Sequence, residues 1–358
     1  MITLADVMPA ACAAAGMATP THIPANQHIV VLLIDGMGYE NLRNVDSKKL
    51  STSFLTDQRS IDATFPTTTP VSLASLGTGV TPGEHGFVGA TFELAEFDQV
   101  LAPLKWVDSP HALAVQPDDT WFEKAAHAGL AVTRIGPAAY AESGLTKAVL
   151  RGGNHVAAEN LADLKARILE VAQSPGITYA YYPKLDKTGH VYGVDSMEWR
   201  KVAGKVVEMI RSVVATLPST ATLVVTADHG MLDISHRVWI EDEPQLTRHM
   251  RLLTGEPRFR HVFAEPGQQS ALLADWKSLE PVADILTREE FIESKLLGEV
   301  AEFVEPRIGD IVAIARETNA IASRTVDERV SNLRGHHGSR TDIERRVPFA
   351  VMAGYGRG

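Results

Sequence analysis

The chain contains one cysteine, Cys12, among its 358 residues. A single thiol cannot form a disulfide within the chain, so no disulfide framework supports the fold and the redox compartment is left open. No apolar run approaches the roughly 18 residues that a membrane helix needs. The first twenty residues lack a basic start and include Asp6 and two prolines, which is unlike a secretion signal. These absences favour a cytoplasmic location without membrane contact.

Positive charge is also in short supply. The chain has 34 Lys and Arg against 44 Asp and Glu, a formal net charge of −10. Binding along a nucleic acid polymer or an anionic membrane needs surplus positive charge, so this balance argues against both. It does not argue against small phosphate substrates. With 45% apolar residues, the chain can bury a large core in one large or two modest domains.

Apolar runs and helical patterns alternate along the chain. Residues 29–34 and 222–227 are continuous apolar runs, as in strands buried on both faces of a parallel sheet. Three further strands are expected in this sheet, at residues 177–182, 311–315 and 347–352. Apolar residues at helical spacing predict helices within residues 161–171 and 199–213.

This alternation predicts an α/β fold with a central, mostly parallel sheet flanked by helices. We expect a single domain over residues 1–358. Residues 237–275 interrupt the sheet rhythm with mixed charge, several arginines and prolines. They are interpreted as a small cap insertion over the site.

Five short motifs supply side chains that bind metals or attack phosphorus. They are IVVLLIDG, TFPTTTP, LDKTGH, VVTADHG and GHHG. The residues concerned are Asp35, Thr69, Asp186, His190, Asp228, His229 and His337. Three carboxylates and three imidazoles exceed the needs of one ion, and such ligands suit zinc or a similar divalent metal. Two such ions can grip one phosphoryl oxygen and activate both the attacking and the leaving oxygen.

Each residue taken alone has a more ordinary interpretation. An Asp after a strand often caps a helix or stands in a turn, and Asp186 and His190 have the i,i+4 spacing of a surface pair. Either His336 or His337 could be an exposed loop residue, and the three threonines could cap the following helix. The five motifs together favour the metal site.

The order and spelling of these motifs resemble the alkaline phosphatase superfamily, and within it the nucleotide pyrophosphatase/phosphodiesterase branch (type I phosphodiesterases). The resemblance rests on DG, FPTxT followed by TGVTPGEHG, DxxGH, ADHG and HHG, and it runs from Asp35 to His337. The C/S-x-P-x-R signature of sulfatases, the G-N-S-E-V-G-H stretch of phosphoglycerate mutases and the D-S-A-A-T serine motif of alkaline phosphatases are absent.

The resemblance implies a two-zinc phosphoric ester hydrolase. It assigns one metal to Asp35, Asp228 and His229 together with Thr69, and the other to Asp186, His190 and His337. Among the three threonines it selects Thr69 as the nucleophile, acting through a phosphothreonine intermediate. The implied substrate is a small phosphodiester or a nucleotide pyrophosphate. Alternatives are a phosphomonoesterase or phosphonate hydrolase with the same metals, and an inactive phosphate-binding or metal-binding protein.

One departure from the family pattern concerns substrate binding. Many relatives carry an Asn a few residues after the H-G-I motif, where this chain has Ala90. Lys147, Arg151 and Asn154 lie in a loop-like stretch and could replace it, with Arg151 as the best fork for two phosphoryl oxygens. An arginine beside two glycines is more often a surface residue, so Arg151 is a candidate only. Phe87, Phe92 and Trp106 could stack on a nucleobase or pack in the core. Nothing in the sequence indicates an oligomeric state.

Overall fold

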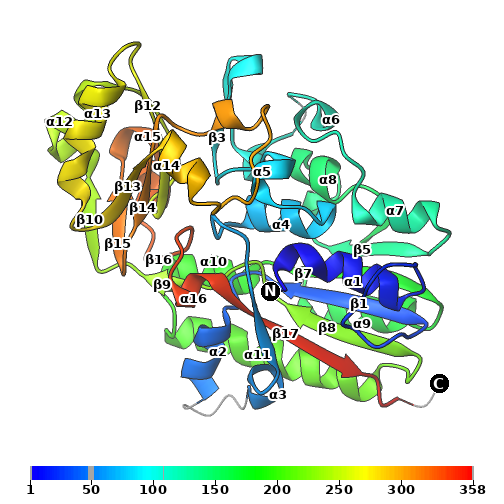
Figure 1. Ribbon diagram of the computed structural model, residues 1–358. Coiled ribbons are helices and arrows are strands. Elements are labelled where there is room, and N and C mark those ends of the chain that lie inside the picture. The colour runs from blue at the N-terminus through cyan, green and yellow to red at the C-terminus, as the bar shows by residue number, and fades with distance from the viewer. Residues whose placement is uncertain (1, 47–51, 108, 357–358) are drawn as a thin grey trace.

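The computed structural model describes residues 2–46, 52–107 and 109–356 and centres on a seven-stranded sheet (Figure 1). The strands follow the order β2 (Arg59–Asp62), β17 (Arg346–Ala353), β8 (Ala221–Thr226), β1 (His28–Ile34), β7 (Gly176–Tyr182), β5 (Val132–Gly136) and β6 (Asn154–Ala157). The five from β8 to β6 are parallel, whereas β17 runs antiparallel to β8 and β2 antiparallel to β17. The predicted mostly parallel sheet is confirmed.

The central strands are buried because they are apolar along their whole length. Every residue of β1 and of β8 is buried, which accounts for the missing hydrophobic alternation in their sequences. In the register of the sheet, Ile34 at the end of β1 pairs with Tyr182 at the end of β7. The carboxyl ends of these strands therefore lie together at one edge.

Helices cover both faces of the sheet (Figure 1). One face carries α9 (Leu161–Val171) and α11 (Met197–Thr216), and the other α1 (Val7–Ala14), α4 (Thr69–Thr78) and α7 (Trp121–His127). The predicted apolar stripes of α9 and α11 point inward, with Leu164, Ile168, Val206 and Ile210 buried. Among the described residues, no helix is long and apolar enough to cross a membrane.

Shorter elements connect these layers. The helices are α2 (Tyr39–Asp46), α3 (Ser53–Thr56), α5 (Pro82–His85), α6 (Ala112–Val115), α8 (Gly144–Val149), α10 (Lys184–Tyr192) and α16 (Asp342–Arg345). The strands form two-stranded ribbons: β3 (Phe92–Leu94) with β4 (Gln99–Leu101), and β9 (Leu232–Asp233) with β16 (Gly335–His336).

A second, smaller unit has its own antiparallel sheet. Its strands follow the order β11 (Met250–Glu256), β12 (Phe259–Ala264), β14 (Ile311–Ala315) and β13 (Ala283–Thr287). Its remaining elements are the parallel pair β10 (His236–Trp239) and β15 (Asn319–Ala322), with α12 (Pro244–Arg248), α13 (Gln269–Trp276), α14 (Arg288–Glu293) and α15 (Arg324–Ser331). A separate apolar core includes Leu246, Val262, Leu272, Trp276, Ala313 and Ile321.

The predicted insertion at residues 237–275 forms the first part of this second unit, which continues to α15. The prediction that residues 311–315 join the main sheet is wrong, because β14 pairs with β12 and β13. A continuous apolar strand looks the same in sequence whichever sheet it completes.

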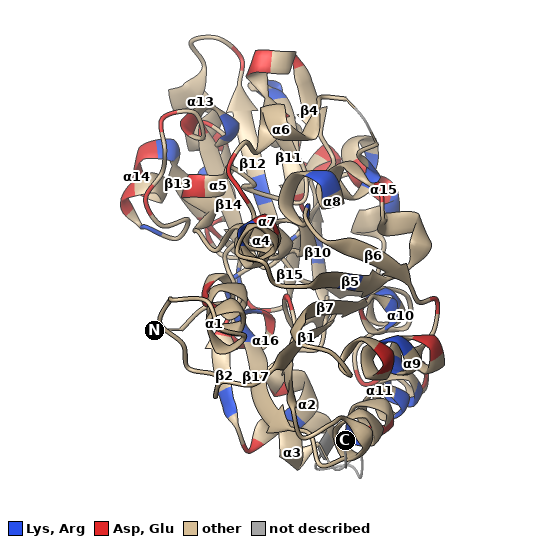
Figure 2. Ribbon diagram, turned by 90° about the vertical axis from the view of Figure 1, so that its right-hand side faces the viewer, with Lys and Arg blue, Asp and Glu red and all other residues tan. Residues whose placement is uncertain are grey.

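A buried ion pair joins the second unit to α16. Arg258, in the turn between β11 and β12, donates to both carboxylate oxygens of Glu344 over 3.0 and 2.8 Å, and both side chains are fully buried. Glu344 also accepts from the backbone N–H of Ser339 at 3.0 Å. The carboxylate thus fixes the loop that follows β16. Elsewhere, Figure 2 shows positively and negatively charged residues interspersed along the ribbons of both units.

Candidate metal centre

The structure brings together all seven residues of the five motifs. Asp35 follows β1, and Asp228 and His229 follow β8, so all three stand at the carboxyl edge of the sheet, where open α/β sheets assemble ligand sites. Asp186 and His190 lie on α10, directly after β7, and His337 follows β16. Thr69 is the first residue of α4. All seven side chains except His190 are buried.

Asp35, Asp228, His229 and Thr69 form the first cluster. Nε2 of His229 lies 3.6 Å from Oδ1 of Asp35 and 3.4 Å from Oδ2 of Asp228. The same nitrogen lies 3.2 Å from Oγ1 of Thr69. One carboxylate oxygen from each acid, one imidazole nitrogen and one hydroxyl therefore converge on one point.

Asp186, His190 and His337 form the second cluster. Nε2 of His190 lies 3.3 Å from Oδ2 of Asp186 and 3.3 Å from Nε2 of His337. Oδ1 of Asp186 lies 3.8 Å from the same nitrogen of His337. The predicted i,i+4 pair on α10 thus meets a histidine nearly 150 residues away in the chain.

The two clusters adjoin. Ligand atoms of Asp35, Asp228 and His229 all lie within 4.8 Å of one another, and so do those of Asp186, His229 and His337. Gly36 makes this approach possible: its φ is +71°, and a Cβ there would lie 2.9 Å from Cβ of Asp186. Most other residues would be strained in that conformation and would push α10 away.

The three imidazoles are held in the orientation that a metal ligand needs. Nδ1 of His229 donates to the carbonyl of Gly230 at 3.0 Å, Nδ1 of His190 to that of Gly335 at 2.8 Å, and Nδ1 of His337 to that of Thr67 at 2.9 Å. Because a carbonyl can only accept, each Nδ1 carries a proton and each Nε2 faces the clusters. Metal-binding histidines are commonly fixed in this way.

The carboxylates supply the matching acceptors. Oδ1 of Asp35, Oδ1 of Asp186 and Oδ2 of Asp228 are buried and have no hydrogen-bond partner among the described residues. Buried carboxylate oxygens rarely lack a partner, because desolvating charge is costly. Unpaired oxygens beside oriented Nε2 atoms fit one or two divalent cations bound by oxygen and nitrogen.

The electrostatics of the site also favour bound cations. Burial, and then the charges of Asp228 and Asp186, raise the pKa of Asp35 well above its ordinary value. Burial would also raise the pKa of Asp186, but the facing His190 holds it below its usual range, and Asp186 in turn raises the pKa of His190 to about 9. Asp35 therefore faces two other carboxylates without a positive charge of its own, and a bound cation would supply one.

The three threonines have different surroundings. The hydroxyl of Thr67 donates to the carbonyl of Ser339 at 2.6 Å and accepts from the backbone N–H of Gly338 at 3.1 Å, so it fixes a loop. The hydroxyl of Thr68 faces Glu256. Only the hydroxyl of Thr69, of the three, lies among the ligand atoms.

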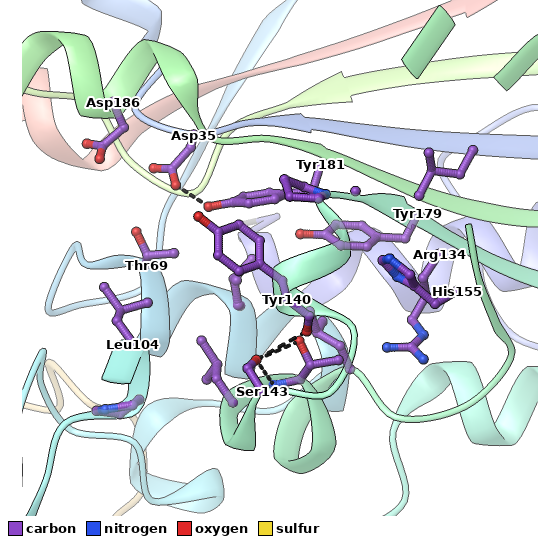
Figure 3. A pocket seen from close by; sticks show the side chains of 18 of the residues that line it. Asp35, Thr69, Leu104, Arg134, Tyr140, Ser143, His155, Tyr179, Tyr181 and Asp186 are labelled. Carbon is purple, nitrogen blue, oxygen red and sulfur yellow. Dashed lines mark hydrogen bonds between the residues drawn. The ribbon is translucent and has the colours of Figure 1, made fainter. Parts of the chain in front are cut away.

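A cavity of about 290 Å³ opens beside this site. Thr69, Asp35 and Asp186 lie at one end of it, and the rings of Tyr140 and Tyr181 stand along its length (Figure 3). Apolar residues contribute most of the remaining wall, among them Leu73, Leu104, Leu145 and Leu150. A phosphoryl group at Thr69 could therefore carry an organic group into the cavity.

Two residues of the site were missed from the sequence. Tyr181 donates a hydrogen bond from its phenol to Oδ2 of Asp35. Glu256, at the end of β11, lies 3.7 Å from Nδ1 of His337, and burial raises its pKa to about 8. The position of Tyr181 at the carboxyl end of a predicted strand was an available signal. No local pattern marks Glu256, which comes from the second unit.

Arg151 and Lys147 do not line this cavity. Arg151 pairs with Glu123 at 3.0 Å and donates to backbone carbonyls that include those of Ala148 and Asp118. Lys147 pairs with Glu142 at 3.6 Å. Phe87, Phe92 and Trp106 are buried in the main core.

The site geometry agrees with a comparison of the sequence with family models. The model of the type I phosphodiesterase/nucleotide pyrophosphatase family matches residues 29–340. The chain belongs to this family. Its members hydrolyse phosphoester bonds, which makes this chain a hydrolase of that class, as the motifs predicted. A search among curated proteins finds no match.

Solved structures share the fold at low sequence identity. The human ectonucleotide pyrophosphatase/phosphodiesterase 5 superimposes with a TM-score of 0.73 at 17% identity, covering 90% of this chain and 87% of that one. The murine protein, as an inactive threonine-to-alanine variant in complex with AMP, gives 0.72 at 18%, with the same coverage. Phosphonoacetate hydrolase from Sinorhizobium meliloti 1021, in complex with phosphonoformate, gives 0.69 at 18%, covering 92% and 91%.

Proposed function

We propose that this chain hydrolyses small phosphodiesters or nucleotide pyrophosphates with two divalent ions, most naturally zinc. One observation carries the proposal: three unpartnered carboxylate oxygens and three oriented Nε2 atoms converge beside the hydroxyl of Thr69. One ion would be held by Asp35, Asp228 and His229 with Thr69, and the other by Asp186, His190 and His337. When bound, such ions neutralise phosphoryl charge and lower the pKa of a coordinated hydroxyl.

Thr69 is the proposed nucleophile. Its Oγ1 forms a bond to phosphorus and releases its proton to solvent, the bond between phosphorus and the leaving-group oxygen breaks, that oxygen takes up a proton, and a phosphothreonine remains. Water then breaks the new P–O bond and restores the hydroxyl. The inactivity of the murine relative with alanine in place of a threonine supports this role. So does the position of Thr69 at the N-terminus of the ten-residue helix α4, where backbone N–H groups and the helix dipole favour a phosphate.

The second candidate function is hydrolysis of a phosphonate. It is favoured by the similarity to phosphonoacetate hydrolase, which covers 92% of this chain. The departure at Ala90 also leaves room for it, because the side-chain donor common among diesterases of the family is missing there. A protein that merely binds phosphate or metal is less consistent with the site, which retains the hydroxyl and every ligand of both sets.

One assay separates these functions. Zinc-loaded protein is offered bis(p-nitrophenyl) phosphate, p-nitrophenyl phosphate and phosphonoacetate at equal concentration. A higher kcat/KM for the diester is the expected result, and a higher value for the monoester or the phosphonate would select that alternative. Absence of turnover on all three, with two zinc ions bound, would point to a binding protein.

The geometry of the site does not test the other predictions about the chain. A small phosphate-ester substrate such as a nucleotide suits a cavity of this size, and no nucleic acid polymer or membrane partner is proposed. The cytoplasmic location and a phosphate-binding role for Arg151 and Lys147 stay predictions. For Arg151, a role at the phosphoryl group would require its present contacts to break.

A further inference from the structure

Three polar side chains stand in a row across adjacent strands at the far end of the cavity. In the parallel register of the sheet, Arg134 of β5 pairs with Tyr179 of β7 on one side and with His155 of β6 on the other. All three line the cavity; Arg134 and His155 lie at the end away from Thr69 and Asp186, and the ring of Tyr179 extends from that end towards Tyr140 (Figure 3). Side chains at paired positions of neighbouring strands project from the same face of a sheet.

Each of these side chains has a buried polar atom without a partner. Nε of Arg134, Nε2 of His155 and the hydroxyl of Tyr179 make no hydrogen bond to any described residue, although Tyr179 is only 3% exposed. Few buried polar atoms in a native protein are left so. Three of them around one cavity indicate that a bound molecule supplies their partners.

Arg134 gives this row a positive charge. No carboxylate of the described residues lies within ion-pair distance of its guanidinium. Glu142 acts on it only from a distance, because that side chain is exposed and pairs with Lys147 at 3.6 Å. A guanidinium stays charged in a protein, so this half-buried one would attract an anion into the cavity.

The two flanking groups are neutral hydrogen-bond formers. Burial, and then the charge of Arg134, lower the pKa of His155 below its ordinary value, against weaker opposing effects of Glu142 and Glu159. Burial raises the pKa of Tyr179 well above 10. At neutral pH the row therefore presents one cation, one phenol O–H and one uncharged imidazole, a set that complements an anion with two or more oxygens.

The spacing relates this row to the metal centre. Tyr179 and Tyr181 are two positions apart on β7, so their side chains share a face about 6 to 7 Å apart along the strand. Tyr181 contacts Asp35, whereas Tyr179 belongs to the row. The wall between the two ends is mainly apolar or aromatic, with Leu145, Leu150 and Tyr140 among its residues.

We propose that the Arg134, Tyr179 and His155 row binds a second anionic group of the substrate, a carboxylate or a phosphate, at the far end of the organic group esterified to phosphorus. This inference rests on the proposed function in that it places the phosphoryl group at Thr69. It narrows the substrate class to phosphoric or phosphonic esters with a charged tail beyond an apolar or aromatic body.

The test measures binding, so that it does not depend on turnover. Zinc-loaded protein is titrated in a calorimeter with alkylphosphonates of increasing chain length and with the same compounds ending in a carboxylate or a second phosphonate. At the chain length that spans the cavity, the charged tail is expected to tighten binding on the order of 10- to 100-fold. The tail that gives the larger gain identifies the preferred anion.

Substitutions then locate the gain. Arg134→Met should abolish the gain from the charged tail while binding of the plain alkylphosphonate changes little. Tyr179→Phe removes a hydroxyl that has no protein partner, so the fold should survive and the gain should shrink. Arg167→Met is the matched control, because Arg167 lies on the exposed side of α9, outside the cavity, and pairs with Glu170.

The outcomes separate this inference from the proposed function. A protein that hydrolyses bis(p-nitrophenyl) phosphate but gains nothing from a charged tail at any length would overturn the inference alone. An equal loss for charged and plain ligands in Arg134→Met would do the same. A gain that depends on Arg134 in a protein without turnover would keep the anion site and overturn the proposed hydrolysis.

Discussion

The imidazoles of His229 and His337 stack nearly face to face, with ring centroids 3.6 Å apart and planes inclined by 20°. His229 belongs to the ligand set that includes Thr69, and His337 belongs to the set whose other members lie on α10. Because the two rings pack directly against each other, a shift of one ligand set would move the other, although the sets come from distant segments of the chain. Removing either ring would disturb both sets, whereas removing an acid from one set can be selective.

Asp186→Ala should therefore remove one metal ion and leave the other. This change deletes the only carboxylate of the second set, and the fold should persist because Asp35 and Asp228 stand on other strands. Elemental analysis should find close to two divalent ions per chain in the native protein and close to one in the variant, with activity lost. Glu170→Gln, on the exposed side of α9, is the control. Full activity with one ion or none would refute the two-metal site.

Thr69→Ala should lose nearly all turnover, and Thr69→Ser should retain part of it, because serine keeps the hydroxyl. Thr67→Ala should instead lower stability by about 1 kcal/mol, since that hydroxyl holds the loop at Gly338 and Ser339. Rate measurements paired with thermal unfolding distinguish the two effects. If Thr68→Ala were the inactive variant, the nucleophile would be misassigned by one residue.

Tyr181→Phe should weaken metal binding without removing a ligand. The phenol of Tyr181 donates to Oδ2 of Asp35, and this bond orients the carboxylate and favours its charged form. Loss of such a supporting bond typically costs about 10- to 100-fold in metal affinity. Competition with a chromogenic chelator measures the change. An unaltered affinity would mean that Asp35 is held by other contacts.

Arg258→Met should destabilise the chain by about 3 to 5 kcal/mol, because it leaves the carboxylate of Glu344 buried without its counter-charge. Denaturant unfolding measures this loss. The double variant with Glu344→Gln should recover part of it, since both charges are then gone. A double variant no more stable than Arg258→Met would mean that Glu344 acts mainly through its bonds to the loop at Ser339.

Stability should fall in mild acid through His85. Burial, and then the charge of Arg307, lower the pKa of this imidazole from 6.5 to about 3. Between these values the unfolded chain binds a proton that the folded chain does not. The contribution of His85 to the free energy of unfolding should thus decrease by about 1.4 kcal/mol per pH unit as pH falls below 6.5, until it levels near pH 3.

Substitution of His85 can show how much this residue contributes to the pH dependence of stability. His85→Gln should be less stable at neutral pH, because Nε2 of His85 hydrogen-bonds to Oγ of Ser75 at 2.9 Å. Between pH 6 and pH 4, the free energy of unfolding of this variant should change less steeply with pH than that of the native protein. The difference should be about 1.4 kcal/mol per pH unit, which corresponds to one proton. Parallel slopes would show that His85 is charged in the folded state.

The candidate metal site could be predicted from the sequence because several of its residues directly follow strands with unambiguous apolar runs. Asp35 and Asp228 stand directly after β1 and β8, and neighbouring parallel strands must end at the same edge. The choice between His336 and His337 needed the structure. Nε2 of His336 is bonded to the carbonyl of Leu333 at 3.1 Å, and only His337 reaches the clusters.

Other features depend on contacts that no local pattern records. Arg151 stands in a glycine-rich stretch that is typical of a loop. Its guanidinium nevertheless forms an ion pair with Glu123 and hydrogen bonds to backbone carbonyls earlier in the chain. Arg134 and His155 lie on short strands of weak apolar character, and their relation appears only from the sheet register. Sequence patterns specify which face a side chain takes, whereas the pairing of strands specifies its neighbours.

The Nδ1 atoms of all three clustered histidines donate hydrogen bonds to main-chain carbonyls, those of Gly230, Gly335 and Thr67. A carbonyl survives any amino acid replacement that preserves the backbone path. Replacing the surrounding side chains should therefore leave the orientation of the three rings unchanged. Lineages that share this framework can remodel the cavity, the second unit and the outer surface while keeping the reactive centre intact, which is a structural basis for divergent specificity at very low sequence identity.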